Sequence, residues 1–200
     1  ISRLVGAVLS ALAGLVFAAG AIYLQVEYGD PGDWPATILT ALLFLASGVV
    51  GAVLLMRRTA AIALVTAGAL GIAAHAALVG LLVPRLEPLL LSPRLEKALE
   101  RADLAPRGGA PGPVAVTGYS EPSMIFLLGT TTELTDPAGA ARAVAQGRPA
   151  VVEGRQDKAF RAALAALGQA ARPAGVVDGF DYSDGDKERL TLYRGAPIQP

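Results

Sequence analysis

Residues 34–56 read WPATILTALLFLASGVVGAVLLM, and this stretch contains no charged side chain. Two further apolar runs flank it, residues 4–24 (LVGAVLSALAGLVFAAGAIYL) and residues 59–83. Each run supplies the roughly 20 residues that a helix needs to cross a hydrocarbon core of about 30 Å. The sequence therefore predicts three transmembrane helices within residues 1–84.

The composition of the whole chain agrees with residence in a membrane. Of the 200 residues, 53% are hydrophobic and only 17% are charged, whereas an ordinary soluble domain carries about 25% charged residues. The 17 basic and 17 acidic residues cancel, which removes the positive surplus typical of a nucleic-acid-binding protein. We therefore expect membrane lipids, and not nucleic acid, as partners.

The residue types that build many metal and cofactor sites are scarce. The chain has no cysteine and a single histidine, His75, which excludes thiolate and multi-histidine metal sites. We predict no cofactor and no metal bound by this chain. His75 lies inside the third apolar run, where a hydrogen bond to a neighbouring helix is favoured over contact with a lipid phosphate or a proton path.

The first apolar run has a second interpretation, as a signal peptide. Arg3 precedes it, and residues 19–21 (AGA) resemble a cleavage site. The run continues to Leu24, however, and is longer than the core of about 7 to 15 residues of a signal peptide. A transmembrane helix is the preferred interpretation. The chain begins with Ile1 and not with Met, so we expect a fragment with further sequence upstream.

The loops between the runs predict an orientation. Arg57 and Arg58 form a short basic loop between the second and third runs, whereas residues 27–33 contain acidic residues and no basic one. Short basic loops remain in the cytoplasm, so the acidic loop and everything after Pro84 are expected outside it. We predict a multi-pass protein of the bacterial inner (plasma) membrane with a periplasmic C-terminal domain.

The chain after Pro84 has a different character, since it carries all but three of the basic and all but three of the acidic residues. For residues 85–113 the sequence predicts an interfacial helix, with Ser92 as its N-cap, followed by a Gly- and Pro-rich linker. Residues 114–200 predict a small extracytoplasmic α/β domain. Its expected strands are 114–119, 131–135, 149–153, 175–182 and 189–193, and its expected helices are 123–128, 137–146 and 156–167.

The alternation of these strands and helices determines the predicted fold class. Strand, helix, strand, helix, strand and helix imply a mostly parallel sheet with helices on both faces and right-handed crossovers. The last two strands flank the turn of residues 183–186 (SDGD), which predicts a closing antiparallel β-hairpin.

Tyr119, Ser120 and Glu121 are the candidate substrate-binding residues of this domain. They follow the first expected strand, and ligands of open α/β sheets gather at the carboxyl ends of strands. A polar contact to a sugar or phosphate and a cap of the following helix are both compatible with these residues. Gly118 stands alone where a dinucleotide fingerprint needs several glycines, which argues against nucleotide binding. Arg85, just beyond the third run, is a candidate phosphate ligand.

An acidic cluster near the end of the chain superficially suggests calcium. Its members are Asp178, Asp181, Asp184 and Asp186. Their spacing does not match an EF-hand loop, which ends in a bidentate glutamate. Ser, Asp and Gly are also the residues that hairpin turns commonly contain, which accounts for residues 183–186 without a metal ion. We therefore predict a turn and no metal site.

Two segments carry a resemblance to a known family. Residues 114–136 (VAVTGYSEPSMIFLLGTTTELTD) and residues 179–194 (GFDYSDGDKERLTLYR) resemble the C-terminal extracytoplasmic domain of bacterial integral-membrane glycosyltransferases of the protein O-mannosyltransferase and aminoarabinose-transferase type. The resemblance covers the second half of the chain and the order of the membrane helices before it. It implies transfer of a sugar from a polyprenyl-phosphate donor to a lipid or protein acceptor.

The resemblance does not extend to the catalytic residue. In this family an acidic residue in the first extracytoplasmic loop of the full enzyme acts as the base on the acceptor. No position of this chain corresponds to that loop, and Asp30 and Asp33 belong to a late loop by their place before the last spans. We therefore predict no catalytic residue within these 200 residues, and the polyprenyl-phosphate sugar is a partner of the full-length enzyme.

A second function remains open from the residues alone. A complete three-span membrane protein that presents a small periplasmic α/β module for binding or assembly, without catalysis, has the same features. The reading frame upstream of Ile1 distinguishes the two. Further apolar spans with an acidic first outer loop indicate the transferase, and a start codon immediately upstream indicates the module.

The predicted orientation can be tested with reporter fusions. An enzyme that is active only outside the cytoplasm is expected to be active when fused after Pro200 and silent when fused after Arg58, because the basic loop stays inside. Activity is normalised to the amount of fusion protein in the membrane. The reverse pattern of activity contradicts the orientation.

Overall fold

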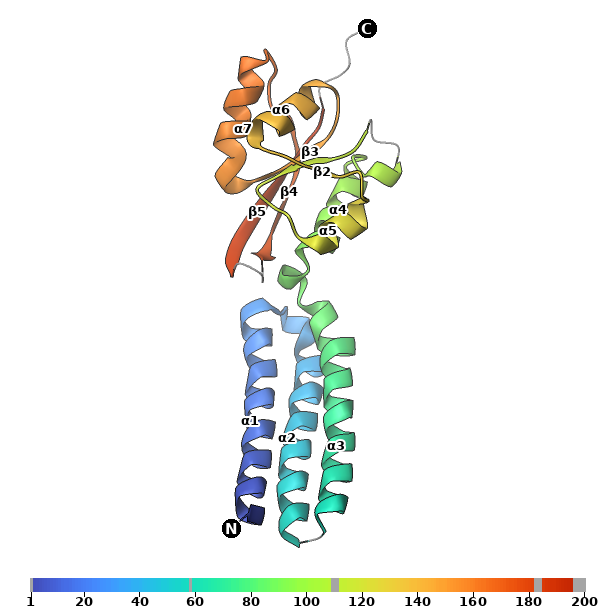
Figure 1. The fold of residues 1–200 in the computed structure, drawn as a ribbon, viewed down its shortest axis with the longest axis vertical. Helices are drawn as coiled ribbons and strands as arrows, with labels where there is room; N and C mark the ends of the chain where they lie inside the picture. Colours follow the sequence, from blue (N-terminus) through green and yellow to red (C-terminus); the bar gives the residue numbers. More distant parts are fainter. Residues whose placement is uncertain (1, 58, 109–111, 182–184, 196–200) are drawn as a thin grey trace. The chain divides into compact units, whose positions relative to one another are not determined.

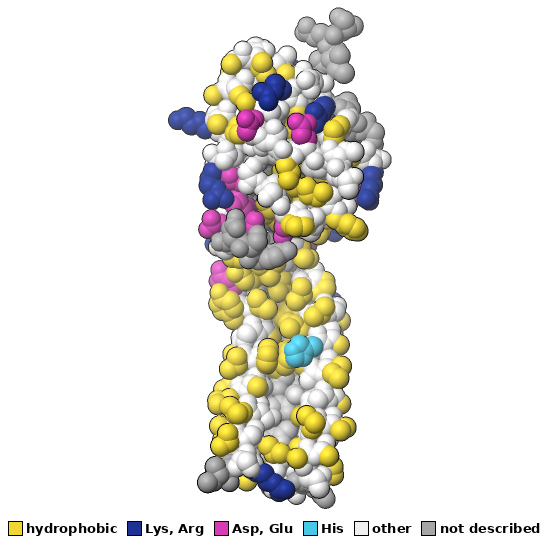
Figure 2. All heavy atoms as spheres, in the orientation of Figure 1, with side chains coloured by type: hydrophobic (Ala, Val, Ile, Leu, Met, Phe, Trp, Pro, Cys, Tyr) yellow, Lys and Arg dark blue, Asp and Glu magenta, His cyan; other side chains and the backbone are white. Residues whose placement is uncertain are grey.

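Three long helices lie side by side in the first part of the chain (Figure 1). The structure is a computed structural model, and it describes residues 2–57, 59–108, 112–181 and 185–195. It divides into two compact units, Ile1–Glu87 and Pro88–Pro200, each treated by itself below. Apolar side chains cover the helices of the first unit, whereas charged side chains gather on the second (Figure 2).

The first unit contains the three predicted apolar helices. They are α1 (Ser2–Tyr28), α2 (Trp34–Arg57) and α3 (Ala60–Ala77), with the short turns η1 (Pro31–Asp33), η2 (Leu78–Leu82) and η3 (Val83–Arg85). Together these elements form three segments, each long and apolar enough to cross a membrane. The predicted number and position of membrane-capable helices are thus confirmed. Arg58, part of the predicted basic loop, lies outside the described residues.

Two glycines allow α1 and α2 to approach closely. A Cβ atom added to Gly14 would lie 2.7 Å from the carbonyl oxygen of Phe44 and 2.8 Å from the Cα of Gly48. A Cβ on Gly48 would lie 2.7 Å from the carbonyl oxygen of Ser10, whose own hydroxyl donates to the Gly48 carbonyl over 3.1 Å. Small residues provide such contact where lipid removes the hydrophobic drive for helix association.

An aromatic cluster joins all three helices and contains His75. The ring of Phe17 stacks on that of Phe44 with 5.1 Å between centroids, and His75 packs edge-on against both at 5.7 and 5.0 Å. Nδ1 of His75 lies 2.8 Å from the carbonyl oxygen of Gly71 and donates to it, since a carbonyl can only accept. The expectation of a hydrogen bond to a neighbouring helix is therefore wrong, because Gly71 is one turn away on the same helix.

The second unit is built on a five-stranded sheet in the order β2-β1-β3-β5-β4. The strands are β1 (Ala115–Thr117), β2 (Glu133–Leu134), β3 (Ala150–Glu153), β4 (Pro173–Asp181) and β5 (Asp186–Tyr193). β1 is parallel to β2 and β3, whereas β5 is antiparallel to both β3 and β4.

The prediction of a mostly parallel sheet is wrong, and the sheet is mixed. The reason is that β5 folds back along β4 and inserts next to β3, so that two of the four pairings are antiparallel. Residues 183 and 184 of the predicted turn lie outside the described residues.

Helices cover both faces of the sheet (Figure 1). Side chains from α4 (Leu91–Arg101) and α5 (Pro122–Leu128) share one core with Val151 of β3. Side chains from α6 (Pro137–Ala145) and α7 (Gly154–Ala166) share a second core with Ala150 and Val152 of the same strand. Successive strand residues thus point to opposite faces, which gives the predicted three layers. The remaining short turns are η4 (Glu87–Leu89) and η5 (Pro106–Gly108).

The boundary between the units differs from the predicted one. Residues 85–113 were expected to form an interfacial helix and a linker outside the domain, but the second unit begins at Pro88. Leu91, Leu95 and Leu99 of α4 are buried in the same core as Val116. Their spacing of four residues forms one apolar stripe on the helix, and the sheet buries that stripe. Residues 109–111 of the predicted linker lie outside the described residues.

The close approach of α1 and α2 predicts opposite effects at two glycines of the same helix. Gly14→Ala is expected to lower stability by about 1–3 kcal/mol because its Cβ meets backbone atoms. Gly20→Ala is the control, since a Cβ there meets nothing within 4 Å and alanine favours the helix. Unfolding in mixed detergent micelles, followed by the fluorescence of the single tryptophan, Trp34, measures both. Equal effects of the two variants contradict the close crossing.

Candidate functional site

The topology of the parallel strands defines one edge of the sheet as the place for a site. β1 lies between β2 and β3, and the crossovers to these neighbours pass through α5 on one face and α6 on the other. The carboxyl ends of β1 and β3 therefore form a topological switch point, where open α/β sheets bind ligands. We call this region the switch-point edge. It comprises residues 118–121 after β1, residues 153–155 at the end of β3, and the adjoining ends of β4 and β5.

Gly118 allows the two strand ends to close together. Its φ of +84° is in the region that favours glycine. A Cβ at this position would lie 2.6 Å from the Cβ of Glu153 and 2.9 Å from the Cγ of Gln156. The tight contact brings the segment after β1 against the start of α7.

A buried carboxylate is the centre of the hydrogen bonding that follows β1. One oxygen of Glu121, Oε2, accepts from the hydroxyls of Ser92 at 2.5 Å, Tyr119 at 2.6 Å and Ser123 at 2.7 Å. Glu121, Tyr119 and Ser92 are buried. A buried carboxylate requires such donors because its desolvation is costly. The network joins α4, the end of β1 and the start of α5.

The structure assigns different roles to the residues that the sequence singled out. Tyr119 and Glu121 come together at the switch-point edge, whereas Ser120 between them is exposed. Glu121 occupies the N-cap position of α5, but its side chain makes no capping hydrogen bond. Ser92 was predicted to cap α4, yet that helix begins at Leu91 and Ser92 lies inside it. Its hydroxyl donates to Glu121 instead, because its place inside the first turn points it at this buried carboxylate.

Tyr119 keeps its proton over the whole physiological range. Burial raises the pKa of Tyr119 above its ordinary value, and the hydrogen bond to Glu121 raises that pKa further. The phenol is therefore a hydrogen-bond donor at this position. Its chemical role is to hold Glu121 in place.

Four buried carboxylates gather at the switch-point edge on the face covered by α4 and α5. Their exposed fractions are 8% for Glu121, 4% for Glu153, 9% for Asp181 and 5% for Glu188. The strand alternation explains the arrangement, because Glu153 lies two residues beyond Val151 and Glu188 two residues before Leu190, both in that core. Sequence reasoning missed Glu153 and Glu188. The sequence does contain a signal for them, because each glutamate stands at a strand position whose side chain the alternation directs toward the core.

A single arginine links the carboxylates of the central strands. Nε of Arg155 lies 3.1 Å from Oε1 of Glu153, and one terminal nitrogen lies 2.5 Å from Oε1 of Glu188. The other terminal nitrogen lies 3.4 Å from Asp186. Carboxylates thus outnumber the guanidinium group at this edge. Such a surplus of negative charge repels phosphate and other anions.

Arg85, the predicted phosphate ligand, belongs to the first unit. Its Nε lies 3.7 Å from Oδ1 of Asp33, its side chain is 46% exposed, and it also donates to the carbonyl of Leu81. Oδ2 of Asp33 accepts from the backbone nitrogen of Asp30 over 3.3 Å. The loop between α1 and α2 therefore uses its aspartates for turn structure and for a loose ion pair with Arg85.

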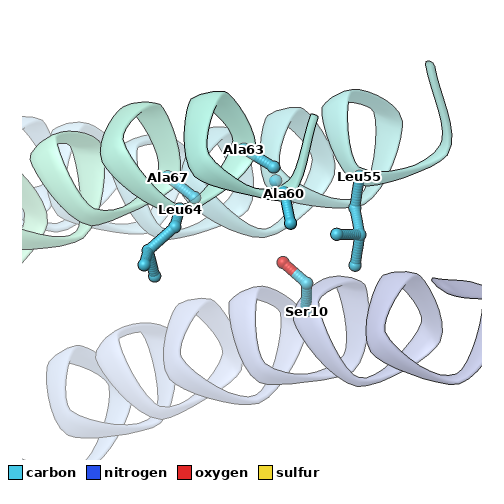
Figure 3. Close-up of a pocket in the computed structure, with 7 residues that line it drawn as sticks. Ser10, Leu55, Ala60, Ala63, Leu64 and Ala67 are labelled. Atoms are coloured by element: carbon cyan, nitrogen blue, oxygen red, sulfur yellow. The ribbon is translucent and has the colours of Figure 1, made fainter. Parts of the chain in front are cut away.

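An apolar groove of about 350 Å³ lies among the three long helices (Figure 3). Its lining contains one hydroxyl, that of Ser10, which already donates to Gly48. Small and aliphatic side chains form the rest, so the groove suits a lipid acyl chain or another helix and offers no chemistry. The lining residues are Ser10, Gly51, Leu55, Ala60, Ala63, Leu64 and Ala67.

Metal-ligating side chains are not grouped for coordination in the part of the chain that the structure describes. Within those residues, no group of three or more His, Cys, Asp or Glu side chains is arranged to hold a metal ion. Of the aspartates considered for calcium, Asp178 forms an exposed ion pair with Arg189 at 2.7 Å, and Asp184 lies outside the described residues.

Comparison of the chain with protein-family models, with curated proteins and with solved structures finds no match. Function is therefore argued from the geometry above and from the resemblance of residues 114–136 and 179–194.

The Glu121 network predicts a stability difference between two neighbouring hydroxyls. Tyr119→Phe removes a donor to a buried carboxylate and is expected to lower the free energy of local opening by about 1.5–3 kcal/mol. Ser120→Ala is the matched control, because Ser120 is exposed. Hydrogen–deuterium exchange of peptides from α4 and β1, in the whole chain in micelles, measures the opening. Unchanged protection in Tyr119→Phe contradicts the assigned role.

Proposed function

We propose that this chain forms the last three membrane helices and the terminal α/β domain of a glycosyltransferase that uses a polyprenyl-phosphate sugar. The observation that carries the proposal is the position of the resembling segment. Residues 114–136 fold as β1, α5 and β2, with Tyr119 and Glu121 at the switch-point edge, and they follow three membrane-capable helices in the sequence. The order of membrane helices followed by an α/β domain is the one that the resemblance implies.

The charge distribution of the first unit supports an orientation with the α/β domain outside the cytoplasm, and the bacterial inner membrane is the location that the resemblance implies. Arg57 ends α2 at the end where α3 begins, whereas Asp30 and Asp33 lie in the loop between α1 and α2. These two loops are at opposite ends of α2, and the positive-inside rule assigns the basic one to the cytoplasm. Arg85, at the end of the third segment, then shares the outer side with the acidic loop.

The residues divide into two chemical roles under this proposal. Arg85 binds the phosphate of the lipid donor, since its guanidinium is half exposed. Its ion pair with Asp33 is long and therefore weak, so a phosphate can replace the carboxylate of Asp33. The switch-point edge, with its surplus of carboxylates, accepts hydrogen bonds from sugar hydroxyls. The base that activates the acceptor is supplied from outside these 200 residues.

One observation favours the second function, a non-enzymatic module for binding or assembly. The hydroxyls of Ser92, Tyr119 and Ser123 all point to Oε2 of Glu121. Three of the polar groups nearest the predicted site are thus used to hold the fold together. A domain with this internal network serves equally well as a rigid docking module on a membrane protein.

Transfer of labelled sugar from a polyprenyl-phosphate donor tests the proposal. Membranes that contain the product of the full reading frame are expected to transfer label, and the purified 200-residue chain is expected to be inactive because it lacks the base. In the full-length product, Asp30→Asn and Asp33→Asn are each expected to retain most of the activity. Arg85→Ala is expected to raise KM for the donor about 10-fold or more, the loss of one charge-assisted hydrogen bond.

The outcomes separate the two functions. If folded full-length protein transfers label from none of the donors, the non-enzymatic module is supported. If Asp30→Asn or Asp33→Asn abolishes turnover at normal protein levels in the membrane, the base lies in this chain and the turn assignment is wrong. If Arg85→Ala leaves KM unchanged, the donor phosphate binds elsewhere.

A further inference from the structure

Two carboxyl groups of the switch-point edge are buried together between β3 and β5. Glu153 is the last residue of β3 and pairs with Leu190 of β5. Arg155 lies in the first turn of α7, directly after β3, and Glu188 lies two residues before Leu190 on β5. Glu153 and Glu188 are each at least 95% buried.

One guanidinium group faces both of these carboxyl groups. Arg155 binds Oε1 of Glu153 through Nε and Oε1 of Glu188 through a terminal nitrogen. The backbone nitrogen of Arg155 also donates to Oε1 of Glu153 over 2.8 Å. Two ionised carboxylates would therefore share one positive charge in a buried place, which leaves one negative charge in excess.

The second oxygen of Glu188 has no donor. Among the residues that the structure describes, Oε2 of Glu188 is the buried side-chain oxygen or nitrogen without a hydrogen-bond partner. Glu153 and Glu188 lie beside the same guanidinium group, since Arg155 contacts one oxygen of each, but two ionised carboxylates have no hydrogen to share. One added proton supplies that missing hydrogen.

We propose that Glu153 and Glu188 form a one-proton site that locks the start of α7 to β5. With the proton bound, one carboxyl group donates to the other, and Arg155 neutralises the remaining charge. With the proton released, both carboxylates depend on Arg155 alone, and the junction of β3, α7 and β5 loosens. The inference concerns the fold of the α/β domain and is independent of the transferase proposal.

The electrostatic surroundings of Glu188 favour a bound proton at mildly acidic pH. Burial and the neighbouring carboxylate of Glu153 raise the pKa of Glu188 to about 6, while Arg155 lowers it. The charged or titratable groups beside Glu188 are Glu153 at the end of β3, Arg155 on α7 and Asp181 at the end of β4, and Asp186 on β5 contacts the same arginine. Beyond them, Tyr119 and Glu121 on the side of α5 interact with each other, and Tyr119 interacts with Asp181.

The sign of the pH effect follows from this raised pKa. The folded chain holds the proton more tightly than the unfolded chain, whose Glu has its ordinary pKa of 4.5. The stabilisation is therefore complete below pH 4.5 and is lost as the pH rises through about 6. The domain is locked in mildly acidic surroundings and looser at neutral pH.

A titration of the whole chain in detergent micelles tests the one-proton site directly. NMR of ¹³C-labelled glutamate side chains is expected to show one carboxyl group that titrates near pH 6, which is about 30-fold tighter proton binding than at an ordinary glutamate. Glu188→Gln is expected to remove this titration. Glu153→Gln is expected to move it toward the ordinary range. Asp178→Asn is the control, because Asp178 forms an exposed ion pair between β4 and β5.

Hydrogen–deuterium exchange supplies a second readout. After correction for the intrinsic pH dependence of exchange, protection of β5 and of the first turn of α7 is expected to fall between pH 5 and 7, values that bracket the pKa of about 6. Glu188→Gln is expected to abolish this fall, since a neutral amide replaces the protonated acid. The proposal is overturned if every glutamate of the folded wild-type chain titrates below pH 5, a result that needs no variant to fold. It is also overturned if protection stays pH-independent in the wild type.

Discussion

The carboxylate of Glu121 is the interaction on which the architecture of the α/β domain depends. A buried carboxylate must be surrounded by donors, and Ser92, Tyr119 and Ser123 supply them from three elements. This requirement brings α4 into the domain although it directly follows the membrane part in sequence. One acidic side chain thereby connects α4 to the segment that follows β1.

The membrane part depends on a different physical constraint. Hydrocarbon provides no hydrophobic drive between helices, so packing relies on the close contact of small residues. Gly14 and Gly48 bring the backbones of α1 and α2 together, and the rings of Phe17, Phe44 and His75 join all three helices. The apolar groove beside Gly51 shows where these three helices leave space for lipid or for a further helix.

The carboxylates of the switch-point edge both hold the fold together and determine which ligands the edge can bind. Its four buried carboxylates outnumber the one guanidinium of Arg155, so the edge favours ligands that donate hydrogen bonds and disfavours phosphate. In the proposed function, the phosphate of the donor binds to Arg85 of the first unit instead. The proposed transferase would thus handle the two halves of a sugar-phosphate donor with separate groups, one basic and one acidic. The same acidic surplus makes a shared proton the natural counter-ion for Glu188.

The sequence by itself determined the features that depend on local pattern. The length and composition of three apolar runs predicted membrane-capable helices, in preference to a signal peptide for the first run. Alternating strand and helix signals predicted the α/β layers and placed Tyr119 and Glu121 at a strand end. Tertiary structure alone decided the rest. β5 inserts beside β3, α4 joins the core, and Glu153 meets Glu188 across strands distant in sequence. Strand order and buried charge pairs depend on which distant segments meet, and residue periodicity within one segment carries no information about that.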